Sequence, residues 1–199
     1  TSRYGIRRSR RMWELSHQSV DQLAALLTRL HIRCDLSTRD TVHYATTAQA
    51  AERLRQECAL RVRSGFGAEW LRPAQLRGLT GIAGHGAILS TGNAQFDPYR
   101  ACVGVLRAAA AAGARVFERS EVRRIERAQN RVRIRTRHGT LHADRVIIAT
   151  GYATPQFRPL AGRFRMYRTY VLVTEPIGRS QRDDVGLSDV MLWDTERPY

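Results

Sequence analysis

The residues best suited to chemistry in this sequence close an uninterrupted apolar run. Residues 145–152 read Arg-Val-Ile-Ile-Ala-Thr-Gly-Tyr. Four apolar residues without polar alternation predict a strand covered on both faces, as in the parallel core of an α/β sheet. Ligands of such sheets bind beyond the carboxyl ends of the strands, and a small residue pair there lets the backbone approach a nucleotide. We therefore expect a nucleotide cofactor near Ala149, Thr150 and Gly151, with Tyr152 beside it.

A glycine at the end of a strand also closes ordinary turns, so the preceding elements must show what it belongs to. Residues 98–112 predict a helix of about four turns. Asp97 is a good N-cap, Pro98 suits the first helical position, and Gly113 suits the left-handed position after the last turn. Small apolar residues recur on one face, which favours close packing against a sheet: Ala101, Cys102, Val105, Ala109 and Ala112.

The chain after this helix predicts an antiparallel excursion that returns to the apolar run. In residues 131–137, arginines alternate strictly with Val, Ile and Thr, which indicates a strand with one dry and one wet face. Residues 138–140 form a turn that leads into Leu141-His142-Ala143. Helix, strand, antiparallel excursion and buried strand thus make one continuous unit.

Residues 96–151, followed by residues 169–176 (Thr-Tyr-Val-Leu-Val-Thr-Glu-Pro) and 192–199 (Leu-Trp-Asp-Thr-Glu-Arg-Pro-Tyr), carry a family resemblance. In this order the segments resemble the FAD-dependent D-amino-acid oxidase and amine oxidoreductase superfamily. The bacterial branch of sarcosine oxidases, glycine oxidases and γ-glutamylputrescine oxidoreductases is the most similar. Residues 11–16 and 32–35 resemble the helical segment that follows the first flavin-binding unit in that family.

The resemblance implies a mixed α/β fold with α+β character. Part of a Rossmann-like FAD-binding domain would be interleaved with a mixed-sheet substrate domain. Residues 1–40 would be a helical segment of the FAD-binding domain, and residues 96–162 a second part of it. Residues 41–95 and 163–199 would be the first and second parts of the substrate domain.

The resemblance also implies positions for cofactor and substrate. The backbone around Val122 should meet the adenine side of FAD, and residues 149–152 should pass near the dinucleotide. Tyr167, Tyr170 and Trp193 are candidates for the sheet face that holds substrate, although ordinary sheet packing would also explain these aromatic residues. No catalytic residue is assigned, and the six scattered histidines predict no metal site.

An enzyme of this family would remove a hydride from a carbon that bears an amine and pass it to FAD. The resulting imine would be hydrolysed by water, and the protein would orient the C–H bond. The expected partners are a small-molecule amine or amino acid and oxygen or another electron acceptor. The choice between amine and amino acid, and between oxidase and dehydrogenase, stays open.

The Gly-x-Gly-x-x-Gly turn that receives the FAD pyrophosphate in this family is absent from the sequence. Residues 81–86 and 65–67 have glycines in other arrangements and are interpreted as loops. We therefore expect an internal portion of a longer enzyme that lacks the N-terminal nucleotide-binding unit and binds FAD weakly by itself. A truncated, non-catalytic remnant is the alternative.

The charge of the chain raises an interpretation from another class. Its net charge is +15 and all 33 basic residues are arginine, so an Arg-rich nucleic-acid-binding domain is an alternative. The arginines are spread along the chain, however, and the clusters at residues 7–11 and 131–137 suit a helix surface and the wet face of a strand. We expect no nucleic-acid partner.

Cysteine usage and hydropathy bear on location. The three cysteines form no C-x-x-C pair, which favours reduced thiols in a bacterial cytoplasm. No apolar run approaches the length needed to cross a bilayer. We expect a cytoplasmic protein without a membrane span.

Overall fold

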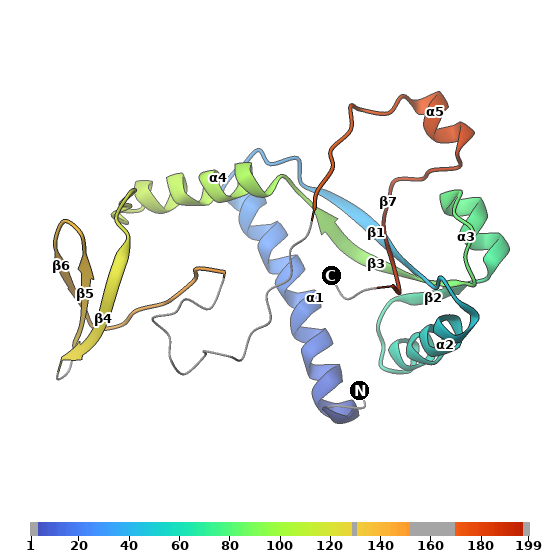
Figure 1. The fold of residues 1–199 in the computed structure, drawn as a ribbon, viewed down its shortest axis with the longest axis horizontal. Coiled ribbons are helices and arrows are strands. Elements are labelled where there is room, and N and C mark those ends of the chain that lie inside the picture. The colour runs from blue at the N-terminus through green and yellow to red at the C-terminus, as the bar shows by residue number, and fades with distance from the viewer. Residues whose placement is uncertain (1–3, 129–130, 152–169, 197–199) are drawn as a thin grey trace. The chain divides into compact units, whose positions relative to one another are not determined.

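The computed structural model describes residues 4–128, 131–151 and 170–196 (Figure 1). They fall into two compact units. Unit 1 contains residues 4–113 and 174–196, and unit 2 contains the described residues between 114 and 173. The described residues contain helices together with parallel and antiparallel strands. This mixture confirms the predicted mixed α/β class.

Unit 1 is built on a four-stranded mixed sheet with the order β2-β3-β1-β7. Its strands are β1 (Ser37–Tyr44), β2 (Ala68–Leu71), β3 (Ala87–Gln95) and β7 (Val190–Asp194). β1 and β2 both pair antiparallel with β3, whereas β7 pairs parallel with β1. The parallel pair places Trp193 opposite His43, although these residues are far apart in the sequence.

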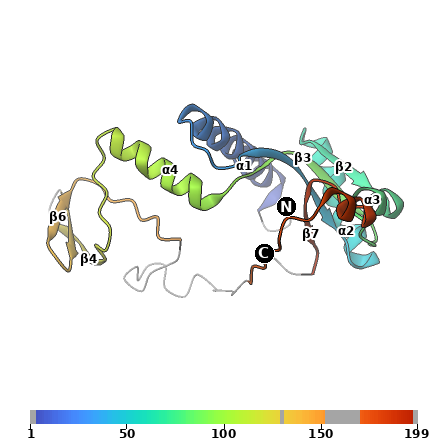
Figure 2. The ribbon, with the colours of Figure 1, turned by 90° about the horizontal axis from the view of Figure 1, so that it is seen from above.

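Two helices cover opposite faces of this sheet. They are α2 (Ala48–Arg63), as the amphipathic pattern of residues 47–62 predicts, and α3 (Pro73–Thr80). Ile88 packs with α2, whereas its neighbour Ala87 packs with α3, and successive strand residues point to opposite faces. Figure 2 shows both helices beside β2 and β3. The cluster under α2 contains Ala45, Ala51, Leu54, Cys58 and Ile88, and that under α3 contains Val42, Leu71, Leu76 and Ala87.

The remaining long helices of unit 1 are α1 (Gly5–Arg29) and α4 (Pro98–Ala111). Asp97 accepts a hydrogen bond from the Arg100 backbone N–H at 3.0 Å, and Gly113 has a φ of +95°, so the predicted bounds of α4 are confirmed. Its predicted apolar face is only partly correct. Ala101 is buried with Leu27 of α1, but Cys102 is exposed, because only the face of α4 that carries Ala101 packs against the N-terminal segment.

Charged residues occupy one end of each of two helices in unit 1. The basic cluster at residues 7–11 lies on the first turns of α1, as predicted. The polar sequence between Pro176 and Leu187 predicts a loop around Asp183 and Asp184. This prediction is wrong, because the two residues end a short helix, α5 (Arg179–Asp184). Among the described helices, none combines the length and the hydropathy needed to cross a membrane.

Unit 2 contains an antiparallel sheet of three strands in sequence order, β4 (Val122–Ala128), β5 (Arg131–Thr136) and β6 (Thr140–Ala143). This confirms the predicted excursion. Ile134 pairs with Ile125 on one side and Leu141 on the other. On β4, Glu126 accepts hydrogen bonds from Arg133, the closer at 2.7 Å, and this interaction holds the pKa of the Glu126 carboxyl below its usual range.

Two predicted strands are absent from the part of unit 2 that is described. Residues 145–150 have no regular secondary structure, and Ile147 is 91% exposed. The sequence also predicts a strand over residues 166–174 that Glu175-Pro176 ends. Residues 170–173, however, are irregular and 82–95% exposed, so this prediction is wrong where the residues are described. A strand needs a paired neighbour to satisfy its backbone polar groups, and neither run pairs with another described segment.

Candidate functional site

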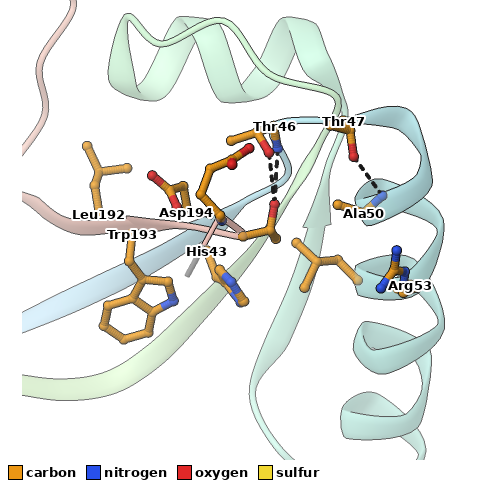
Figure 3. Close-up of a pocket in the computed structure, with 11 residues that line it drawn as sticks. His43, Thr46, Thr47, Ala50, Arg53, Leu192, Trp193 and Asp194 are labelled. Atoms are coloured by element: carbon orange, nitrogen blue, oxygen red, sulfur yellow. Dashed lines mark hydrogen bonds between the residues drawn. The ribbon is translucent and has the colours of Figure 1, made fainter. Parts of the chain in front are cut away.

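A cavity of about 940 Å³ lies in unit 1 where β1 and β7 end and α2 begins (Figure 3). It is lined by residues from these elements and from the turns that follow them: His43, Thr46, Thr47, Ala50, Arg53, Leu54, Leu192, Trp193, Asp194, Thr195 and Glu196. Its size is that of a small-molecule site. Three elements from two separate segments of the chain therefore contribute to one cavity.

Hydroxyl groups hold these segments together. Thr47 is the N-cap of α2, and its side chain accepts a hydrogen bond from the Ala50 backbone N–H at 3.2 Å. The adjacent Thr46 donates its backbone N–H to Thr195 Oγ1 at 3.3 Å, and the two threonine hydroxyl oxygens are 3.1 Å apart. The turn between β1 and α2 is thereby tied to the end of β7 (Figure 3).

His43 and Trp193 form the aromatic part of the cavity. Their ring centroids are 6.1 Å apart with an edge-to-face angle of 63°. Burial lowers the pKa of His43 below 6.5, and the opposing effects of the nearby Glu57 and Asp194 are smaller. The imidazole is therefore largely neutral near pH 7 and can accept a proton or a hydrogen bond.

Charged groups of both signs border the cavity. Arg53 of α2 supplies a guanidinium, and Asp194 and Glu196 supply carboxylates. One Asp194 oxygen accepts a hydrogen bond from the Glu196 backbone N–H at 2.8 Å. A guanidinium binds carboxylates, and carboxylates bind ammonium groups. The lining thus offers complementary groups to a zwitterion such as an amino acid.

The predicted substrate-side residues have different locations. Trp193 lines the cavity and is 42% exposed. Tyr170 belongs to unit 2, where its side chain is 90% exposed. Tyr167 lies outside the described residues. The candidate cavity therefore contains one of the three predicted aromatic residues.

The predicted cofactor residues are all in unit 2, except Tyr152, which lies outside the described residues. Val122 is the first residue of β4 and is 40% exposed. Ala149 and Thr150 precede Gly151, which has a φ of +74° and, among the described residues, nothing within 4 Å of an added Cβ. This open glycine backbone fits the close approach of a dinucleotide. Without a Gly-x-Gly-x-x-Gly turn, the described residues do not complete a pyrophosphate site.

Sequence reasoning missed most of the cavity, including His43, Thr46, Arg53, Asp194 and Thr195. No motif joins them, because the β1 and β7 segments are separated by 149 residues at the Thr46–Thr195 contact. The only local signal was the amphipathic pattern of residues 47–62, which indicated a helix and not a site. Within the described ranges, no group of three or more His, Cys, Asp or Glu side chains could hold a metal ion.

The chain is similar to oxidoreductases both in sequence and in structure. The family "DAO: FAD dependent oxidoreductase" matches residues 2–198. A Rhizobium meliloti (strain 1021) protein, "Probable oxidoreductase OrdL", is 41% identical over 69 residues, which are 34% of this chain and 16% of that protein.

Two solved glycine oxidases are similar in structure. The enzyme from Geobacillus kaustophilus has a TM-score of 0.59 and 25% identity, over 64% of this chain and 36% of that one. The enzyme from Bacillus cereus ATCC 14579 has a TM-score of 0.58 and 21% identity, over 68% of this chain and 39% of that one. The matched regions span less than two fifths of either glycine oxidase.

Proposed function

The chain belongs to the family of FAD-dependent oxidoreductases whose members include amino acid oxidases, and from this we propose that it forms part of an enzyme that oxidatively deaminates an amine or amino acid. The observation that carries the proposal is the family match over residues 2–198, nearly the whole chain. FAD, when bound, supplies the acceptor for the hydride. The electron pair leaves with that hydride, the amine loses a proton, and water hydrolyses the imine to a carbonyl compound and ammonia or an amine.

In this proposal the cavity of unit 1 binds and orients the substrate. Arg53 binds the carboxylate of an amino acid, and Asp194 and Glu196 attract its ammonium group. His43, which burial keeps largely neutral, accepts a proton from that ammonium so that the nitrogen lone pair is available. Trp193 forms an apolar wall beside the imidazole and limits the entry of water.

The cofactor proposal concerns unit 2. Gly151, with its open left-handed backbone, would lie against the dinucleotide together with Ala149, Thr150 and Tyr152, and Val122 would meet its adenine side. The assignment of residues 1–40 and 96–162 to the FAD-binding domain, and of 41–95 and 163–199 to the substrate domain, belongs to the same proposal. A bacterial cytoplasmic location is also proposed, and the free thiols of Cys34, Cys58 and Cys102 support it.

Because this sequence has no Gly-x-Gly-x-x-Gly turn and the chain alone is expected to bind FAD weakly, the test is an anaerobic titration of the FAD-loaded enzyme in which this chain is joined to an N-terminal nucleotide-binding unit. Glycine, sarcosine, D-alanine and γ-glutamylputrescine are added in turn, and absorbance of oxidised flavin and released ammonia or amine are measured. We expect one of these amines to bleach the flavin, and hydrogen peroxide after admission of air would indicate oxygen as the acceptor. FAD-loaded protein that no amine reduces, but that a 2-hydroxy acid does, would contradict oxidative deamination.

The role of the cavity is tested with two matched variants. His43→Gln keeps a hydrogen-bonding side chain but removes the basic imidazole, whereas Arg55→Gln changes an exposed arginine of α2 outside the cavity lining. Flavin reduction should slow by about 10²-fold or more for His43→Gln, as expected for a lost general base, and should stay unchanged for Arg55→Gln. Equal rates in the two variants would remove His43 from the mechanism.

A further inference from the structure

A second cavity in unit 1, of about 640 Å³, lies between the first turns of α1 and the C-terminal half of α2. Its lining combines four arginines with apolar side chains: Tyr4, Ile6, Ser9, Arg10, Met12, Trp13, Arg53, Gln56, Glu57, Leu60, Arg61, Arg63, Ser64 and Phe66. Only one lining residue, Glu57, is acidic. The volume suits a small molecule, and the excess of positive charge favours an anion.

Two of the arginines are held in place by other groups. Arg61 lies over the Trp13 ring at 4.1 Å, donates a hydrogen bond to Ser90 Oγ at 3.2 Å and forms an ion pair with Glu57. Its side chain is only 13% exposed, so it is a fixed part of the wall. Arg10 forms an ion pair with Glu14 at 3.0 Å. These two guanidiniums already have carboxylate partners.

The other two arginines are free to bind a ligand. Within the described part of the chain, neither Arg53 nor Arg63 forms an ion pair, and both are exposed on α2. A guanidinium binds a carboxylate, sulfonate or phosphate through paired hydrogen bonds. Arg53 and Arg63 are ten residues apart on α2, about 15 Å along the helix axis, and Arg53 also lines the substrate cavity. Arg63 is therefore the cation with which an anion in this cavity can pair without displacing an existing ion pair.

The opposite wall is apolar and exposed. Ile6 is 63% exposed and Met12 is 57% exposed, although both lie on the α1 side of the cavity. Phe66 packs with Trp13 at a centroid distance of 5.8 Å and stacks on His17 at 5.7 Å, which gives this wall a rigid aromatic base. Covering Ile6 and Met12 with an apolar group would remove nonpolar surface from water.

We propose that this cavity binds an organic anion with an apolar body, which places its acidic group against Arg63 and its body against Ile6, Met12 and Phe66. Both an aromatic and an aliphatic acid have this chemistry. The site goes beyond the amine-oxidising function proposed above, since apart from Arg53 it is lined by other residues of α1, α2 and the turn after α2. Arg53 alone contributes to both cavities, whereas Arg63 lines only this one.

The test measures binding to the purified chain by isothermal titration calorimetry. The probes are 2-naphthoate, octanoate and the uncharged 2-naphthylmethanol, which has the same ring system as the first. We expect 2-naphthoate or octanoate to bind and 2-naphthylmethanol to bind at least about tenfold more weakly, because it lacks the charge-assisted hydrogen bonds. Preference between the two acids identifies the aromatic or the aliphatic source.

Variants locate the site. Arg63→Gln should weaken binding of the acid by about threefold to tenfold, and Arg53→Gln should weaken it by less. Arg55→Gln, an exposed α2 variant outside the cavity, is the matched control and should bind as the unmodified chain does. All three changes are on exposed side chains, so thermal melting should confirm that each variant folds.

A second readout needs no variant of the binding residues. Labelling the three methionines with ¹³C at the methyl group gives separate NMR signals, and that of Met12 is assigned with Met12→Leu. Binding of the acid should shift the Met12 signal and leave that of Met191 in β7 unchanged. The proposal is overturned if neither acid binds, if 2-naphthylmethanol binds as well as 2-naphthoate, or if Arg63→Gln binds like Arg55→Gln.

Discussion

Replacing Leu76 with alanine should destabilise unit 1 more than any comparable change on its surface. Leu76 of α3 is 0% exposed and packs in one cluster with Val42, Leu71 and Ala87 of the sheet. The substitution removes three carbon atoms, worth about 2.4 kcal/mol in transfer free energy at ~0.8 kcal/mol each. The cavity left among strand residues that cannot move inward adds to this, so we expect a loss of about 3 to 4 kcal/mol in the free energy of unfolding.

Urea unfolding followed by tryptophan fluorescence measures this loss. Trp70 on β2 packs against the sheet of the same unit and reports its unfolding. The matched control is Leu106→Ala in α4, where the leucine is 45% exposed and the expected loss is about 1 kcal/mol. If the two variants unfold at the same urea concentration, α3 is not packed on the sheet as described and the reasoning about this core is wrong.

Three further predictions concern the same unit. Gly86→Ala should lower the melting temperature by several degrees, since Gly86 has a φ of +131° and an added Cβ would lie 2.4 Å from the Trp70 ring; a melt as high as that of the unmodified chain would contradict this packing. Thr46→Val removes the hydroxyl contact with Thr195 and should cost about 1 kcal/mol, with faster hydrogen exchange in β7 as the measurement. For His43, burial lowers the folded-state pKa, so the unfolded chain binds more protons and stability should fall as pH drops through 6.5; urea unfolding at several pH values should show this, and His43→Gln should reduce the slope.

Local sequence signals predicted α2 and α4 of unit 1 well because they act within a few residues. Asp97, Pro98 and Gly113 fix the two ends of α4 whatever packs on it, and Thr47 does the same for the start of α2. The alternation over residues 131–137 likewise predicts β5, since half-exposed antiparallel strands pair with their sequence neighbours. The residues that predict these elements lie within the elements or next to them.

The apolar run at residues 145–150 shows where such reasoning is incomplete. Its apolar composition indicates a strand that is buried on both faces. The composition does not identify the elements that cover those faces or the strands that pair with it. In the described residues nothing pairs with it, and Ile147 is 91% exposed. The same holds for Val171 and Leu172, which are 82% and 95% exposed. Predicting a fully apolar strand therefore requires knowledge of the elements that cover it, whereas an alternating strand can be predicted largely from its own sequence.

The candidate cavity depends on register, which no local pattern of β7 reveals. Val190 and Leu192 pack with the cluster under α3, and this burial turns the alternate residue Trp193 to the other face, opposite His43 of β1. A shift of one residue would exchange the two faces of β7, burying Trp193 beside α3 and moving Leu192 next to the imidazole. The packing of two aliphatic side chains on one face of the sheet therefore determines which groups meet on the other. The chemistry proposed for His43 therefore depends on the packing of Val190 and Leu192 against the cluster under α3.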